Sequence, residues 1–146
     1  MKRIAIVVGV LVVVLYLIAI VLPIDPLERR PGTSLSGDLA VDQDTDWGFV
    51  EGRTRAWIET HTRYLVPHSI TVSAWADNGN LYVGCRECDT KIWPRHVARD
   101  DRVRIRIGDW IYKRRAIRIT DPAERKAVLG PAADRPGLAV FRMDPR

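Results

Sequence analysis

An unbroken apolar segment opens the chain, and alternating apolar and polar residues dominate the remainder. No side chain from Ile4 to Ile24 carries a charge. A helix of that length, rising about 1.5 Å per residue, spans roughly the 30 Å hydrocarbon core of a bilayer. A cleaved signal peptide has a shorter apolar region, about 7 to 15 residues, before a small-residue cleavage site. The pattern therefore predicts an uncleaved, single-pass transmembrane anchor over residues 1–24, with residues 4–24 in the lipid bilayer.

Basic residues flank both ends of this anchor, so charge alone does not orient it. Lys2 and Arg3 precede the apolar segment, and Arg29 and Arg30 follow it. An anchor preceded by three residues is most simply inserted with its start in the cytoplasm. We therefore expect the soluble domain on the periplasmic or extracellular side.

The soluble part divides into a linker and one domain. Residues 25–46 carry Pro, Gly and Ser among acidic residues without a sustained apolar period, which is typical of a linker. The domain is predicted over residues 47–146, a length that suits one core.

Strand-like alternation recurs through the domain, and Asp77-Asn78-Gly79 and Gly108-Asp109 mark hairpin turns. Two short helices are predicted at residues 91–99, with Pro94 in the first turn, and at residues 122–129, with Asp121 as N-cap. This mainly β pattern predicts a small antiparallel split β-barrel with two short helices after the N-terminal transmembrane helix. The predicted strands cover residues 55–64, 69–75, 80–85, 102–107, 111–120 and 138–142.

Charge narrows the choice of partner. The chain has 23 basic and 18 acidic residues, and the two signs alternate along the soluble part instead of forming one basic face. Nucleic-acid binders concentrate Lys and Arg on one face, so we expect no nucleic acid partner. Arg102, Arg104 and Arg106 alternate with apolar residues, which indicates the solvated face of a strand.

Three segments together resemble the split β-barrel flavin-binding proteins related to pyridoxamine-phosphate oxidase, including deazaflavin-dependent nitroreductase and quinone reductase relatives. They are PHSITVSAWADNGNLYVGC, TKIWPRHVARDDRVRIRIGD and ITDPAERKAV. The likeness lies in the order and spacing of the motifs over roughly Trp57 to Val128. It implies a barrel that binds FMN or a deazaflavin in a groove between the subunits of a homodimer.

The resemblance also implies site residues. In the family, the end of the second hairpin strand and the start of the next helix supply hydroxyl and cationic groups to the flavin phosphate. Arg86, Thr90 and Lys91 match that place, and Arg and Lys suit phosphate because they combine charge with hydrogen-bond donors. The strand beside the flavin ring corresponds to residues 69–75. It departs from the family's commoner proline and apolar pattern by offering three polar residues, Ser69, Thr71 and Ser73.

Cys85 and Cys88 have the Cys-x-x-Cys spacing of redox centres and of half a zinc site. The sequence has no second pair and no thioredoxin-like βαβ context. The two cysteines are therefore interpreted as a structural disulfide outside the cytoplasm or as two thiols inside it, and a thiol redox role stays open as an alternative.

Other chemistry has little support. His61, His68 and His96 show no paired metal-ligand spacing, so no metal site is predicted, although one histidine could serve as a haem ligand. Catalytic residues are not identified, since no Ser-His-Asp arrangement or glycine-rich phosphate loop is present. Four large aromatics are expected to fill the core and a dimer interface: Trp57, Trp75, Trp93 and Trp110.

The sequence thus predicts a membrane-anchored, flavin- or deazaflavin-binding oxidoreductase-like protein, for which a lipophilic electron acceptor such as a quinone would suit the anchor. The alternative is a cofactor-free ligand-binding or interaction domain tethered to the membrane, which the polar strand at residues 69–75 favours.

Overall fold

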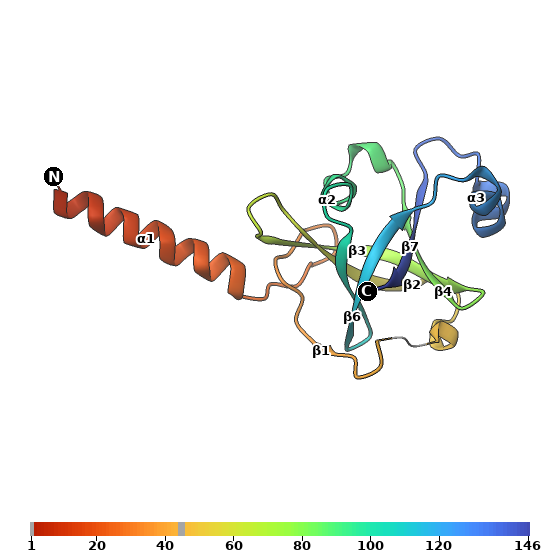
Figure 1. Ribbon diagram of the computed structural model, residues 1–146, viewed down its shortest axis with the longest axis horizontal. Coiled ribbons are helices and arrows are strands. Elements are labelled where there is room, and N and C mark those ends of the chain that lie inside the picture. The colour runs from red at the N-terminus through yellow and green to blue at the C-terminus, as the bar shows by residue number, and fades with distance from the viewer. Residues whose placement is uncertain (1, 44–45) are drawn as a thin grey trace.

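The computed structural model describes residues 2–43 and 46–146, which form an N-terminal helix and a β-barrel (Figure 1). Helix α1 (Lys2–Val21) extends away from the barrel, and none of its residues is buried. Its length and composition would allow it to cross a membrane, and a signal sequence would meet the same criteria. The predicted apolar helix is therefore present, and its relation to a bilayer is taken up below as a proposal.

Six antiparallel strands close the barrel. Their order is β6-β5-β2-β3-β4-β7, and β7 pairs back with β6. Closure removes the exposed sheet edges that would otherwise template aggregation. The predicted antiparallel barrel is confirmed. The strands are β2 (Thr54–His61), β3 (Pro67–Asp77), β4 (Asn80–Cys85), β5 (Arg102–Ile107), β6 (Trp110–Arg118) and β7 (Ala139–Pro145).

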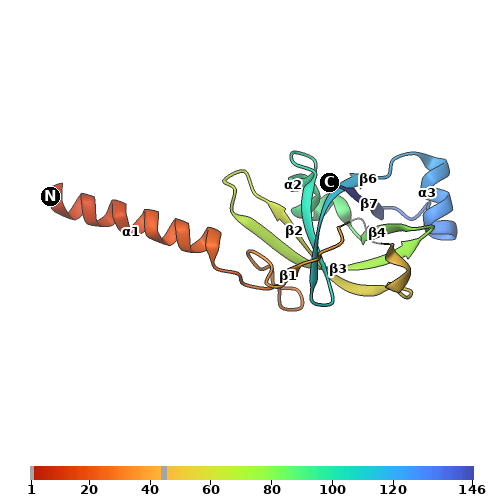
Figure 2. The same ribbon diagram turned by 60° about the horizontal axis from the view of Figure 1, so that its bottom comes forward.

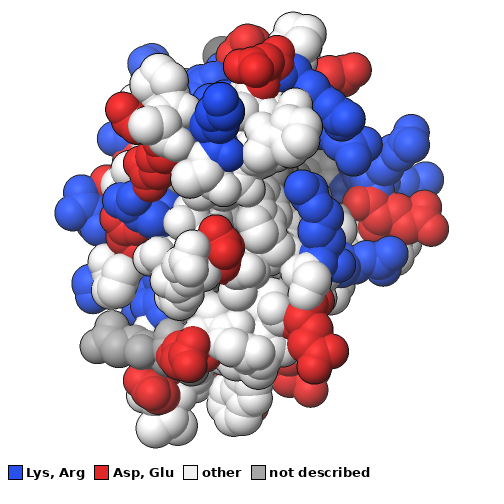
Figure 3. Space-filling view, turned by 90° about the vertical axis from the view of Figure 1, so that its right-hand side faces the viewer, with Lys and Arg blue, Asp and Glu red and all other residues white. Residues whose placement is uncertain are grey.

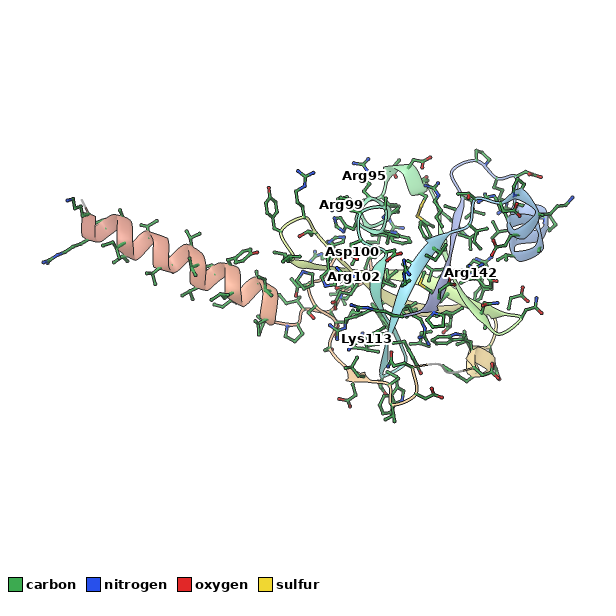
Figure 4. All side chains as sticks on the ribbon, viewed as in Figure 1. Arg95, Arg99, Asp100, Arg102, Lys113 and Arg142 are labelled. Carbon is green, nitrogen blue, oxygen red and sulfur yellow. A yellow bond between two sulfur atoms is a disulfide. The ribbon has the colours of Figure 1, made fainter. Side chains whose placement is uncertain are left out.

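Two short helices lie where the sequence predicts them. Helix α2 (Trp93–Val97) begins with Pro94 in its first turn, and α3 (Pro122–Leu129) follows Asp121. The Asp121 carboxylate accepts a hydrogen bond from the Glu124 backbone N–H at 2.7 Å, which is the expected N-cap. On β7, Arg142 contacts Glu124 of α3 and Asp144, so an ionic link ties α3 to the barrel wall (Figure 4).

Alternation sorts each strand into an inner and an outer face. The inner residues of β5, Val103, Ile105 and Ile107, join the main core with Trp93 and Phe141. The large aromatics do not all lie in the main core. Trp75 packs in a second cluster with residues of α3, and Trp110 is 47% exposed.

The segment predicted as a linker lies along the barrel in its described part, residues 25–43, which we call the strap. Within it, β1 (Asp38–Leu39) pairs in parallel with β6, and Gly32 exchanges backbone hydrogen bonds with Ser69 of β3. The strap therefore connects α1 to the barrel, and it is packed against the strands and does not hang free. Its polar composition reflects the polar outer face that it covers.

The strap crosses two rows of cross-strand neighbours. Ser69, Glu59 and Arg104 lie opposite one another on β3, β2 and β5, and Trp57 and Arg106 lie in the adjacent row. The Arg106 guanidinium stacks over the Trp57 ring at 4.3 Å. The arginine face predicted to be solvated is thus partly covered.

Each row holds one part of the strap. Glu59 accepts a hydrogen bond from the Leu35 backbone N–H at 2.7 Å, and Arg106 pairs with Asp25 at 2.9 Å. Figure 2 shows the β1 part of the strap crossing in front of β6. Because these contacts come from residues far apart in the sequence, the composition of the segment gave no sign of them.

The barrel surface on the α3 side has mixed charge (Figure 3). An uncharged band crosses the middle of this face, and Lys, Arg, Asp and Glu side chains lie on both sides of it. The charges of this face are therefore mixed in sign.

Candidate ligand-binding groove

A groove of about 880 Å³ opens on the outside of the barrel, between the strap, β3 and the connection from β4 to α2. Its volume lies within the range of small-molecule sites. The β3 wall consists of His68 and residues 70–73, and the connection supplies residues 84–87 and 90–93. The strap wall consists of residues 28–31.

Charge in the groove is predominantly positive. Among the described residues that line it, the five cations Arg29, Arg30, Arg53, Arg86 and Lys91 outnumber the two anions. The acidic residues are Glu28 and Glu87. A cleft lined mainly by one sign of charge attracts the opposite sign, so the groove suits an anionic ligand.

Arg86 and Lys91 are available to such a ligand. Neither forms an ion pair with any residue that the structure describes. Arg53 differs, because its guanidinium lies over the Trp75 ring at 4.6 Å and is positioned by that contact.

The edge of β3 is open where it meets the groove. Ser69 uses its backbone groups on Gly32, and Ser73 begins the pairing with β4. Thr71 lies midway between Ser69 and Ser73. Alternate residues of an antiparallel strand direct their backbone groups to the same side, so the N–H and C=O of Thr71 point to the side on which Ser69 meets Gly32 and Ser73 meets β4. The next partner in this register would be Arg86, but β4 ends at Cys85. The Thr71 backbone therefore faces the groove without a strand partner.

The Thr71 side chain adds a second unmatched polar group. Its Oγ1 atom is buried and has no hydrogen-bond partner among the described residues. A buried hydroxyl without a partner is costly, and a ligand in the groove could supply the missing acceptor or donor. The unpartnered Thr71 hydroxyl is consequently the main structural indication that the groove is a ligand-binding site.

Thr90 is less available than its position suggests. Its hydroxyl donates to the Glu87 carbonyl at 2.8 Å, so its only hydrogen is already used. Thr90 fixes the turn that carries Arg86 and Lys91, and its remaining role toward an anion is limited. The cations on either side of it are the better phosphate ligands.

A disulfide joins Cys85 and Cys88 beside this turn. Both cysteines are buried, and Cys85 lines the groove. The disulfide encloses Arg86 and Glu87. The backbone of Glu87 has the left-handed conformation, with φ at 49°. The cross-link therefore restricts the turn that presents Arg86.

Five of the six residues proposed for cofactor binding, all except Ser69, line the groove. Ser69 is fully buried beneath Gly32, and its Oγ has no partner in the described part of the chain. The strap excludes Ser69 from the groove, and the sequence could not anticipate this because the segment 25–46 resembled a free linker.

Histidines gather on one side of the groove, which their spacing along the chain did not reveal. His68 lines it, and the ring of His96 on α2 lies edge-on to the ring of His68, with centroids 5.3 Å apart. Burial lowers the pKa of both histidines, and nearby His68, Arg99 and His61 lower that of His96 further. His96 Nδ1 is 2.9 Å from the Thr60 hydroxyl. No cluster in the described residues is arranged to hold a metal ion.

Comparison with known proteins supports the fold. No family model matches the chain, and no curated protein matches it. Among solved structures, it resembles General Stress Protein 26 from Bacillus anthracis str. Sterne, with a TM-score of 0.53 and 13% identity over 70% of this chain and 88% of that one. A match to the protein Atu2129 (unknown function) from Agrobacterium tumefaciens str. C58 has a TM-score of 0.49 and 13% identity, over 64% of this chain and 48% of that one. At 13% identity, the likeness to General Stress Protein 26 shows the split-barrel fold alone.

Proposed function

We propose that this chain is a membrane-anchored protein whose groove binds a phosphorylated flavin-type cofactor, FMN or a deazaflavin, for oxidoreduction. One observation supports this most strongly. The open edge of β3 at Thr71 faces two cations without ion pairs, Arg86 and Lys91, across a groove of suitable volume. A planar polar ring and a phosphate require this combination of edge hydrogen bonds and positive charge.

The described residues fit such a cofactor in two places. Arg86 and Lys91, with Arg29 and Arg30 of the strap opposite, would hold the phosphate. The Thr71 backbone and hydroxyl would bond the polar edge of the ring, since their partners are otherwise lacking.

A bound flavin would supply the electron- and hydride-transfer chemistry, and the protein would supply binding, orientation and electrostatics. His68 is the titratable side chain of the β3 wall. Because burial lowers its pKa, it is neutral at physiological pH and can either donate or accept a hydrogen bond. We assign it a positioning role.

Membrane attachment through α1 is the second part of the proposal. None of the apolar side chains of α1 is buried by the barrel, so a bilayer would satisfy them. A tether at the bilayer surface suits a lipophilic electron acceptor such as a quinone. A homodimer would add a second subunit beside the groove, as the family resemblance implies.

The binding test uses the full chain in lipid nanodiscs. FMN or deazaflavin is titrated, and quenching of cofactor fluorescence is measured. Lys91→Ala should weaken binding about tenfold or more, which corresponds to about 1.4 kcal/mol. Lys126→Ala is the matched control, because Lys126 is exposed on α3 outside the groove. Absence of binding of either cofactor to the wild-type chain, or equal affinity of both variants, would refute the cofactor assignment.

A cofactor-free ligand-binding domain is the second candidate, and the strap favours it. Gly32 occupies the β3 edge at Ser69, so the chain itself fills part of the strand beside which a ring would lie. The groove would then bind an anion smaller than a flavin, such as a phosphate compound without a ring. Inorganic pyrophosphate that binds with Lys91 dependence in the same nanodiscs, where FMN does not, would establish this alternative.

A further inference from the structure

Tyr16 is a polar exception in the apolar helix. From Ile4 to Ile24 it is the only residue whose side chain bears a polar atom. Its hydroxyl donates a hydrogen bond to the backbone carbonyl of Tyr64, with 2.6 Å between the oxygens. In hydrocarbon a hydroxyl without a partner is costly. This contact therefore satisfies Tyr16 and fixes the position of Tyr64 along α1.

Tyr64 belongs to the turn between β2 and β3, residues 62–66, which we call the hairpin tip. Two backbone hydrogen bonds close it, from Thr62 N–H to the Val66 carbonyl and from Leu65 N–H to the Thr62 carbonyl. The turn is thus an ordered part of the hairpin. Figures 1 and 2 both show this hairpin projecting from the barrel toward the α1 side.

The hairpin tip exposes apolar side chains that the barrel does not cover. Tyr64 is 72% exposed and Leu65 is 69% exposed, with Arg63 exposed beside them. By contrast, the turn between β3 and β4 is the polar sequence Asp77-Asn78-Gly79-Asn80. Tyr, Leu and Arg together suit a membrane interface, where Tyr favours the headgroup level and Arg extends its charge toward water.

The level of this contact follows from helix geometry. Tyr16 precedes the helix end at Val21 by five residues, which at about 1.5 Å per residue is about 8 Å along the axis. Interfacial apolar groups enter a bilayer by roughly 5–10 Å. A span that ends where α1 ends would therefore bring the tip within the interface.

We propose that the hairpin tip is a second membrane-contact surface, which inserts Tyr64 and Leu65 into the bilayer beside α1. The inference rests on the proposed anchoring by α1 and is independent of the groove's ligand. Its consequence is a two-point attachment that fixes the orientation of the barrel. Attachment through α1 alone would leave the barrel free to rotate about the axis of that helix.

The test places a polarity-sensitive fluorophore on single introduced cysteines of the full chain, with the buried native disulfide kept oxidised. The vesicles contain phosphatidylcholine with a minority of phosphatidylglycerol and a lipid that carries a nitroxide quencher high on its acyl chain. The labelled variants are Tyr64→Cys at the tip, Lys126→Cys on exposed α3 and Val10→Cys within α1. Tyr64→Cys keeps the backbone carbonyl that Tyr16 contacts.

We expect blue-shifted emission and strong quenching at position 64, and neither change at position 126. Adding Tyr16→Phe to the Tyr64→Cys variant should reduce quenching at position 64, because only the hydroxyl contact is lost. Equal, weak quenching at positions 64 and 126 with strong quenching at position 10 would overturn the tip insertion while leaving the anchor intact. Weak quenching at position 10 would overturn the anchoring itself and the tip insertion with it.

Discussion

Arg104 on β5 holds the carboxylate of Glu59 directly opposite on β2, with 3.0 Å between Nη1 and Oε2. The same carboxylate oxygen accepts the Leu35 backbone N–H, and Glu59 is 2% exposed. The strap therefore covers the carboxylate of an ion pair that would lie on the barrel's outer surface without it, while the Arg104 side chain stays 26% exposed. This pair links the connection after α1 to β2 and β5 of the barrel.

Replacing Glu59 should release the strap. Glu59→Ala removes the acceptor for Leu35 and leaves Arg104 without its partner, so we expect a loss of about 2–3 kcal/mol in the free energy of unfolding. Urea unfolding followed by tryptophan fluorescence measures this. Asp101→Asn breaks the exposed pair with Arg115 and should cost less than about 1 kcal/mol. Equal losses in the two variants would contradict the docking role of Glu59.

A side chain at Gly32 should also displace the strap. A Cβ there would lie 2.0 Å from the Ile24 carbonyl oxygen and 2.7 Å from Ser69 Oγ, so the backbone must move. We expect Gly32→Ala to cost about 1–3 kcal/mol and to speed tryptic cleavage after Arg29, the strap arginine that no proline follows. Gly48→Ala is the control, because its Cβ meets nothing closer than 3.5 Å. Unchanged cleavage in Gly32→Ala would argue against tight docking.

The disulfide should stabilise the turn that carries Arg86. In the loop-entropy model, closing so short a loop lowers the entropy of the unfolded chain, which raises the free energy of unfolding by about 2 kcal/mol. The Cys85→Ser/Cys88→Ser double variant should therefore unfold at lower urea concentration and bind groove anions more weakly. Reductant should shift the wild type to the same midpoint and leave the variant unchanged. A variant as stable as the oxidised wild type would refute this role.

Acidification should destabilise the region around α2. Burial lowers the pKa of His96, so the folded protein favours neutral His96. Below about pH 6.5, the ordinary histidine value, the unfolded chain takes up a proton that the folded one resists, and stability falls as pH decreases. Melting temperatures between pH 8 and pH 5 measure the slope. His96→Gln should flatten it, whereas the wild-type slope retained in His96→Gln would assign the effect elsewhere, with His68 as the first residue to examine.

A carboxylate near α2 should respond only to stronger acid. Hydrogen bonding from Arg102 lowers the pKa of Asp100 to about 2 (Figure 4). The contribution of the Asp100 carboxylate to the free energy of unfolding is complete above about pH 4 and is lost toward pH 2. Its magnitude is about 1 kcal/mol after solvent screening. The stability difference between wild type and Asp100→Asn should vanish near pH 2. A constant difference down to that pH would contradict the pairing.

Local patterns determined the elements of this fold. Period-two alternation located β5 and β6, Asp77-Asn78-Gly79 located the hairpin of β3 and β4, and Asp121 with Pro122 located the start of α3. These signals can be interpreted from sequence because each depends on residues within a few positions of one another. The order of motifs added the barrel topology, since the likeness concerned a whole fold.

Tertiary structure decided the composition of the groove. The sequence placed Thr71 within a strand, and Arg86 and Lys91 between the next strand and a helix, but only closure of the barrel brought them to one opening. The strap's arginines joined them, and Gly32 covered Ser69, because polar segments with no periodicity give no signal of where they dock. The contact between the rings of His68 on β3 and His96 on α2 likewise depends on tertiary packing. Contacts across long sequence separations depend on how strands pair, which local composition does not encode.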